Sequence, residues 1–262
     1  MSKRPALLEF ENVVVIRGGH RALEGVSFRI GQGENVAILG PNGSGKSSLL
    51  KLLTRELYPV ANERPYRMRI LGRDSWDLFS LRAHLGIVSN DLQSDFAREC
   101  SGWEAVLSGF FSSIGLWANH RVTPGMERRA WRVLERLEVA HLADRPMTAM
   151  SAGEARRILI GRALIHDPDT LVLDEPTTSL DLRAAREFRT TLRKLVRGGT
   201  SLVLVTHALE EVIPEVTRVI LLREGGVFMD GPKESVLSRA NLSKLYRMPV
   251  RLDLEDGIYH VR

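Results

Sequence analysis

The chain has 262 residues, of which 44% are hydrophobic and 26% are charged. These proportions are typical of a soluble globular protein, and they exclude a disordered tail, a collagen-like fibre and a low-complexity scaffold. The formal net charge of +5 favours anionic ligands or membrane surfaces, but it is too small to indicate nucleic-acid binding.

Taken in chain order, short apolar runs and turn residues predict an N-terminal antiparallel β part, followed by strands that alternate with helices. We expect two strands within residues 7–30 and further strands at 35–39, 67–71, 85–89, 170–173, 201–206 and 216–222. We expect a helix from Gly45 onward and helices at 103–111, 126–139, 152–165 and 182–197. Strands that alternate with helices indicate an α/β fold with a mostly parallel sheet.

The domain organisation follows from the helical stretch in the middle of the chain. We expect a single domain over residues 1–262, with a core formed by 1–90 and 168–262 and an inserted helical subdomain at about 91–167. The last residues alternate in polarity, which predicts a small β-hairpin that turns at 255–257.

The segment after the strand at 35–39 matches in full the P-loop pattern G-x-x-x-x-G-K-[ST]. Its glycines let the backbone curl so that several N–H groups face a phosphate, and the following helix adds its positive N-terminal end. Lys46 would bring a full charge to the β- and γ-phosphates of ATP, and the Ser47 hydroxyl suits Mg²⁺. A P-loop NTPase fold is therefore predicted. The predicted nucleotide-binding residues of this segment are Gly40, Pro41, Asn42, Gly43, Ser44, Gly45, Lys46, Ser47 and Ser48.

A second motif follows the buried strand at 170–173, where Asp174 and Glu175 stand in succession. Ligands of parallel sheets bind at the C-terminal ends of the strands, so both carboxylates are placed to act on a nucleotide. Asp174 can hold Mg²⁺, and Glu175 can polarise a water for attack on the γ-phosphate. The alternative is that this carboxylate pair caps the next element.

Three further motifs accompany these two. Residues 150–155 read Met-Ser-Ala-Gly-Glu-Ala, and residues 179–181 read Ser-Leu-Asp. A histidine, His207, stands at the end of the strand at 201–206. Along the chain the order is the P-loop, residues 150–155, the Asp174-Glu175 pair, residues 179–181 and the histidine. In this order the five motifs resemble those of the ATP-binding cassette (ABC) ATPases, in which residues 150–155 correspond to the signature motif, and the resemblance covers essentially the whole chain. The residues that it adds to the nucleotide site are Ser151, Gly153, Glu154 and Asp181, with His207 as a catalytic residue.

The last of these assignments have simpler alternatives. Ser151 could be a plain helix N-cap, with Glu154 completing a capping box. His207 could be a core histidine with satisfied hydrogen bonds.

Two positions depart from the family's usual pattern. The aromatic residue that stacks on adenine is replaced by Arg17, whose planar guanidinium can also stack on a base or can point to solvent. The usual glutamine after the strand at 85–89 is replaced by Asn90, to which we assign a catalytic and Mg²⁺-binding role, with Gln93 as the alternative.

The resemblance also implies partners. In this family, the signature motif of one subunit covers the ATP held by the P-loop of another, which implies a head-to-tail dimer with a second copy or a paralogous cassette. Transmembrane permease subunits would bind at the helical insertion, and import is favoured because a lone cassette chain is the usual importer layout. The sequence is loosely similar to molybdate- and iron-type uptake cassettes.

Other functions are weighed against this one. A soluble ABC ATPase that acts on nucleic acid or ribosomes is the alternative, although most such factors carry two cassettes, which makes nucleic acid an improbable partner. A P-loop kinase leaves the signature motif and His207 unexplained.

The expected location follows from cysteine content and hydropathy. Cys100 is a single cysteine, so it cannot form an intramolecular disulfide, which favours a reducing compartment. No apolar run approaches the roughly 20 residues that cross a bilayer, and residues 1–10 lack a signal-peptide stretch. We expect a cytoplasmic protein at the inner face of the membrane, with a partner that supplies the membrane span.

The predicted helix at 126–139 carries three arginines at four-residue spacing, which places them on one face. The alternatives are a solvated face and a contact with an acidic partner loop or lipid headgroups. The three residues are Arg128, Arg132 and Arg136.

Overall fold

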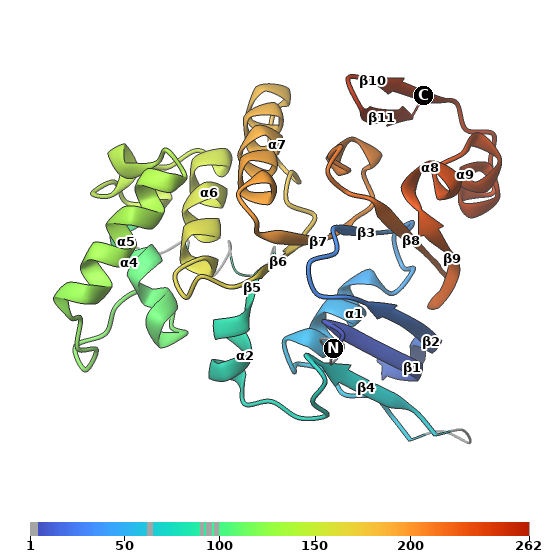
Figure 1. Cartoon of the computed structure of the whole chain (residues 1–262), viewed down its shortest axis with the longest axis horizontal. Coiled ribbons are helices and arrows are strands. Elements are labelled where there is room, and N and C mark those ends of the chain that lie inside the picture. The colour runs from blue at the N-terminus through green and yellow to red at the C-terminus, as the bar shows by residue number, and fades with distance from the viewer. Residues whose placement is uncertain (1–4, 62–64, 90–91, 93–95, 97–99, 262) are drawn as a thin grey trace. The chain divides into compact units, whose positions relative to one another are not determined.

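The computed structural model describes residues 5–61, 65–89, 92, 96 and 100–261. The chain divides into two compact units, the first formed by Met1–Leu78 with Ser201–Arg262 and the second by Phe79–Thr200. Figure 1 labels the elements of both. The second unit contains the segment expected as a helical insertion, and the single-domain organisation stays a prediction.

An antiparallel sheet opens the first unit, as predicted. Strands β1 (Leu8–Arg17), β2 (His20–Ile30) and β4 (Arg67–Ile70) lie in the order β2-β1-β4, with antiparallel pairing throughout. In β2 the side chains alternate between buried and exposed positions towards its end, so one face packs on the core. The two glycines at 18–19 join β1 to β2.

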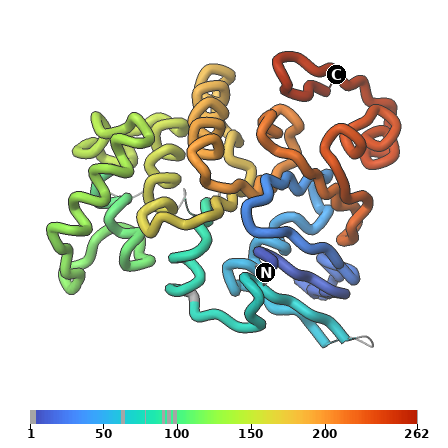
Figure 2. The backbone as a smooth tube through the Cα atoms, viewed as in Figure 1, coloured from blue at the N-terminus to red at the C-terminus, as the bar shows by residue number. Residues whose placement is uncertain are grey.

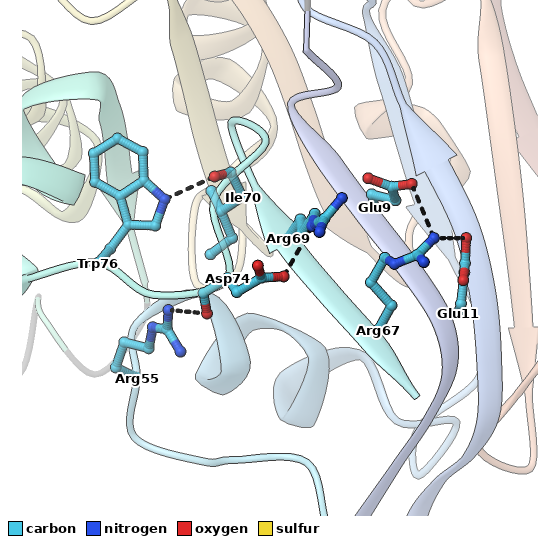
Figure 3. Close-up of polar contacts among 8 residues, drawn as sticks. All are labelled: Glu9, Glu11, Arg55, Arg67, Arg69, Ile70, Asp74 and Trp76. Atoms are coloured by element: carbon cyan, nitrogen blue, oxygen red, sulfur yellow. Dashed lines mark hydrogen bonds and ion pairs between the residues drawn. The ribbon is translucent and has the colours of Figure 1, made fainter. Parts of the chain in front are cut away.

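Polar contacts hold the segment after β4 against that strand (Figure 3). The Arg69 Nε atom lies 2.9 Å from Asp74 Oδ1, and the Trp76 indole N–H donates to the Ile70 carbonyl at 2.7 Å. An exposed ion pair contributes at most about 1 kcal/mol to stability. The indole hydrogen bond and side-chain packing therefore supply most of the stabilisation that holds this segment against β4. A further exposed cluster joins Arg67 to Glu9 and Glu11.

The first unit also holds four neighbouring strands, β7 (Ser201–Thr206), β3 (Val36–Leu39), β8 (Arg218–Arg223) and β9 (Gly226–Pro232), in that spatial order. Strand β3 pairs in parallel with β7 and β8, whereas β9 is antiparallel to β8. Every residue of β3 and β7 is buried, as expected for parallel strands that are covered on both faces. Helix α1 (Lys46–Leu53) follows β3 and contacts β2.

The C-terminal part of the first unit contains α8 (Lys233–Val236), α9 (Arg239–Tyr246) and a hairpin of β10 (Leu252–Glu255) and β11 (Ile258–Val261). The predicted hairpin is thus confirmed, and Figure 2 shows the chain passing from α9 into it. Strand β11 packs against the short 3-10 helix η4 (Leu209–Glu211), which follows β7.

Helices dominate the second unit. Helices α4 (Gly102–Leu107), α5 (Pro124–Arg136) and α6 (Ala152–Ala163) pack on one another. The predicted helix at 103–111 is correct to 107 and continues as the 3-10 helix η1 (Ser108–Phe111). Helix α5 begins at Pro124 because the Thr123 side chain caps it and proline suits the first helical position.

The described part of the second unit also contains parallel strands and further helices. Helix α2 (Leu78–His84) leads into β5 (Leu85–Val88), which pairs with β6 (Thr170–Asp174). Helix α7 (Leu182–Arg197) has the predicted bounds. Within the described ranges, none of the helices has the length and apolarity that a bilayer crossing requires.

Candidate functional site

The P-loop leaves β3 in the first unit through positions that only glycine fits. A Cβ atom on Gly40 would lie 2.4 Å from the Leu222 carbonyl oxygen. Gly45 has a φ of 104° and caps the N-terminus of α1, and a Cβ there would lie 2.7 Å from the Ala22 carbonyl oxygen. The neighbouring strands therefore require glycine at both ends of the loop.

The polar atoms of the loop form a cradle that fits a polyphosphate. The buried Lys46 Nζ donates to the carbonyls of Gly40, at 2.8 Å, and Pro41, at 3.1 Å, so the ammonium lies inside the curl of the loop. Ser44 Oγ is also buried, and it has no hydrogen-bond partner among the residues that the structure describes. A buried hydroxyl without a partner costs free energy, and a phosphate oxygen would satisfy it.

His207 leaves the sheet beside this loop. In the parallel pairing of β3 and β7, Leu39 is the register partner of Thr206, so Gly40 and His207 both follow directly at the same edge. His207 is exposed. The alternative of a core histidine is therefore wrong, and the position fits a residue that faces a ligand at the strand ends.

A support for the P-loop was missed in the sequence. The turn between β8 and β9 contains Gly225, whose N–H donates to the Ser44 carbonyl at 3.2 Å, while its own carbonyl accepts from Glu24 N at 2.8 Å. The Glu224-Gly225 turn is visible in the sequence as a turn signal, but nothing local indicates that it contacts residue 44.

Arg17, the expected adenine-stacking residue, ends β1 opposite His20. Its side chain is exposed. Both the stacking role and the solvent-facing alternative stay predictions.

In the second unit, Asp174 ends β6 and Glu175 follows it, both half-buried. Glu175 has a φ of 42°, in the left-handed region that residues with a Cβ seldom adopt. The N-cap of α7 is Asp181, whose Oδ1 accepts from Ala184 N at 2.7 Å. The neighbouring carboxylate pair at 174–175 is thus not the cap of the next helix.

The signature segment forms the capping box that the simpler alternative describes. Ser151 Oγ accepts from Glu154 N at 3.3 Å, and Glu154 Oε2 accepts from Ser151 N and from its hydroxyl, both at 2.8 Å. The bond from the Ser151 backbone lowers the pKa of the Glu154 carboxyl, and Arg145, 3.2 Å away, adds to this. The cap organises the start of α6, so it is compatible with an anion site at this helix terminus.

The signature segment and the Ser-Leu-Asp segment lie side by side within the second unit. A Cβ atom on Gly153 would lie 3.1 Å from the Ala184 Cβ and 4.0 Å from the Leu180 Cδ2. Two motifs separated by about 25 residues in the sequence thus meet where α6 and α7 begin.

The glutamine-like position lies outside the described residues, as do both of its candidates, Asn90 and Gln93. The strand before it is described, and its residue Val88 pairs with Leu173 of β6. Strand β5 therefore ends at the same edge of the sheet as β6, which Asp174 ends. Among the described ranges there is no cluster of three or more His, Cys, Asp or Glu side chains that could hold a metal.

The arginine face of α5 is exposed. Arg136 Nη2 donates to Thr200 Oγ1 at 3.2 Å, and Arg132 Nε donates to the Arg128 carbonyl at 3.4 Å. Leu134 is buried on the other side of this helix, whereas Trp131 is 41% exposed. Helical geometry places residue 131 at the margin of the buried stripe, where a large ring stays partly in solvent.

Comparisons with known proteins agree over nearly the whole chain. The family described as ABC transporter matches residues 23–178. YlmA of Bacillus subtilis (strain 168), an uncharacterized ABC transporter ATP-binding protein, is 34% identical over 253 residues, covering 94% of this chain and 93% of that protein. The cobalt import ATP-binding protein CbiO of Rhodobacter capsulatus is 35% identical over 239 residues, covering 90% of this chain and 83% of that protein. Among solved structures, the ADP conformation of an ATP-binding cassette of an ABC transporter has a TM-score of 0.77 at 26% identity, covering 92% of this chain and 98% of the other.

Proposed function

The chain belongs to the family of ABC transporter ATP-binding proteins, and from this premise we propose that it is the Mg²⁺-dependent ATP-hydrolysing subunit of an importer. Its fold is the P-loop NTPase fold of ABC cassettes. The observation that carries the proposal is the P-loop itself, with a buried lysine inside the curl and a buried, unsatisfied Ser44 hydroxyl among the described residues.

ATP is held by its phosphates in this proposal. Lys46 and the backbone N–H groups at the start of α1 bind the β- and γ-phosphates, since both supply positive charge at one point. Ser47 and Asp174 would hold Mg²⁺, which offsets the negative charge that develops on the phosphate oxygens.

Hydrolysis transfers the γ-phosphoryl group to water. The water oxygen attacks the γ-phosphorus, the bond to the β-γ bridging oxygen breaks, and ADP and inorganic phosphate leave. Glu175 accepts the proton of the attacking water, and His207 contacts the γ-phosphate from the adjacent strand end. Asn90, or Gln93 in its place, carries the side-chain amide that would contact the Mg²⁺ and the attacking water.

The site is completed by a second subunit. The sequence contains one P-loop and one signature segment, and the family arrangement joins them across a head-to-tail dimer. Ser151, Gly153 and Glu154 of one copy, at the capped N-terminus of α6, then cover the γ-phosphate bound by the other copy, with Asp181 beside them. A paralogous cassette could take the place of the second copy.

The transport role rests on relatives. The name of the CbiO relative describes cobalt import, and we extend import, without its cargo, to this chain. Permease subunits in the membrane bind the second unit, whose α5 presents exposed arginines and Trp131. The protein would then act at the cytoplasmic face of the membrane.

Glu175→Gln tests the catalytic assignment. The amide cannot accept the proton, so ATP turnover should fall by about 100-fold or more while ATP still binds. The variant should accumulate as an ATP-bound dimer in size-exclusion chromatography with Mg-ATP. Glu187→Gln is the matched control, because Glu187 is an exposed carboxylate of α7 paired with Arg183. Turnover of the Glu175 variant at the level of this control would remove Glu175 from the role.

A further inference from the structure

The turn that carries His207 is held from two sides. On one side, Ala208 N donates to Thr206 Oγ1 at 3.0 Å, which ties the turn to the end of β7. On the other side, the Tyr246 hydroxyl donates to the His207 carbonyl oxygen at 3.4 Å. That distance is near the upper limit for a hydrogen bond, so the bond is weak. Its role is to fix the position of the turn.

Tyr246 is suited to donate this bond. Burial raises the pKa of its phenol, and the nearby Glu210 carboxylate raises it further. The hydroxyl therefore stays protonated at neutral pH and presents a hydrogen to the carbonyl.

The end of α9, where Tyr246 lies, is anchored to the turn that supports the P-loop. Arg223 Nη1 donates to the Lys244 carbonyl at 3.2 Å, and the Arg247 guanidinium pairs with the Glu224 carboxylate. The next residue in that turn, Gly225, donates its N–H to the Ser44 carbonyl. One short segment thus contacts both the histidine turn and the support of the P-loop.

A cavity of about 380 Å³ lies between the histidine turn and this C-terminal segment. His207 and Leu209 line one side of it, and Tyr246, Met248 and Val250 line the other. The Tyr246 hydrogen bond therefore links the two sides of this cavity.

We infer that Tyr246 is a positioning residue for ATP hydrolysis. Its hydroxyl donates to the His207 carbonyl and so keeps the imidazole at the sheet edge where the P-loop begins. The inference rests on the proposed function, because it needs His207 to act on the γ-phosphate. Tyr246 acts only through His207. A displacement of about 1 Å in a catalytic group is enough to slow a reaction strongly.

Tyr246→Phe tests the inference because it removes one oxygen and keeps the ring. We expect kcat for ATP to fall about fivefold, as for the loss of one neutral hydrogen bond, with KM for ATP and the Mg-ATP dissociation constant unchanged. Amide hydrogen exchange across residues 207–211 should become faster. Tyr259→Phe is the matched control, since Tyr259 is a buried tyrosine of β11 and lies outside the lining of the cavity.

The outcomes separate this inference from the proposed function. If His207→Ala is inactive while Tyr246→Phe keeps both the wild-type kcat and the wild-type exchange at 207–211, the positioning role is wrong and the ATPase proposal stands. If the wild-type protein binds ATP but does not hydrolyse it, the proposed function fails and the positioning role fails with it. A lower kcat and faster exchange in Tyr246→Phe, with Tyr259→Phe unchanged, supports the inference.

Discussion

Glu175 and Ser179 have backbone torsions that residues with a Cβ seldom adopt, with φ values of 42° and 68°. Such conformations cost on the order of 1–3 kcal/mol each, and they persist where the surrounding structure forces them. Both residues belong to segments that we assign to the nucleotide site. They lie in the turn between β6 and α7, in which Thr178 N donates to the Glu175 carbonyl at 3.1 Å.

Arg17 supplies a prediction at the scale of one side chain. If its guanidinium stacks on adenine, Arg17→Ala should weaken ATP binding by about 1 kcal/mol, the low end for stacking on a base. Arg17→Tyr should restore the affinity or exceed it, because a ring stacks better than a guanidinium. Titration calorimetry measures both, with His20→Ala as the control from the same turn. Equal affinities in all variants would show that Arg17 faces solvent.

At the scale of an element, the start of α6 combines two tasks. The Ser151 and Glu154 side chains satisfy N–H groups that the first turn of a helix leaves unpaired. The approach of Gly153 to Ala184 holds the same turn against the start of α7. The segment that would cover a γ-phosphate is therefore held by contacts within the chain itself.

Glu154 makes this cap dependent on pH. Its pKa is lower in the folded chain than the usual 4.5, so its stabilisation is present above the unfolded pKa and is lost as the pH falls through the folded pKa. Glu154→Gln keeps an acceptor and should lose less free energy of unfolding than wild type between neutral pH and about pH 3.5. Urea unfolding at both pH values measures this. Glu154→Ala loses the carboxylate half of the capping box but keeps the bond from its backbone N–H to the Ser151 hydroxyl, so it should also lower the free energy of unfolding at pH 7. Identical acid sensitivity of the wild type and Glu154→Gln would contradict the assignment.

At the scale of the whole molecule, the proposed site residues fall into two sets. The P-loop and His207 belong to the first unit, and Asp174, Glu175, the signature segment and Asp181 belong to the second. In a two-fold head-to-tail dimer, each ATP would meet the P-loop of one copy and the signature of the other.

Mixing two inactive variants tests this arrangement. Lys46→Ala removes the charge that binds phosphate, and Ser151→Arg places bulk where the opposite γ-phosphate must lie, so each should be inactive alone. An equal mixture should recover about a quarter of wild-type sites, because half of the dimers combine one intact P-loop with one intact signature. ATPase assays over a range of protein concentrations measure the recovery. A mixture that stays inactive, while wild-type turnover per subunit is independent of concentration, would exclude the composite site.

The sequence by itself determined the features that are local in the chain. Four features could be predicted because each depends on residues that lie close together in the sequence. They are the P-loop, the strand before Asp174, the bounds of α7 and the C-terminal hairpin. The family could be predicted for the same reason, since its motifs are short and ordered.

Only the tertiary structure decided how distant segments support the site. The contact of Gly225 with Ser44 and that of Tyr246 with His207 join residues far apart in the chain, through backbone carbonyls that any residue possesses. No side-chain pattern encodes such a pair, because the partner atom is the same at every position. His207 could be recognised by its place in the motif order, but its exposure depends on the register of β3 with β7, which is set by the packing of the buried sheet.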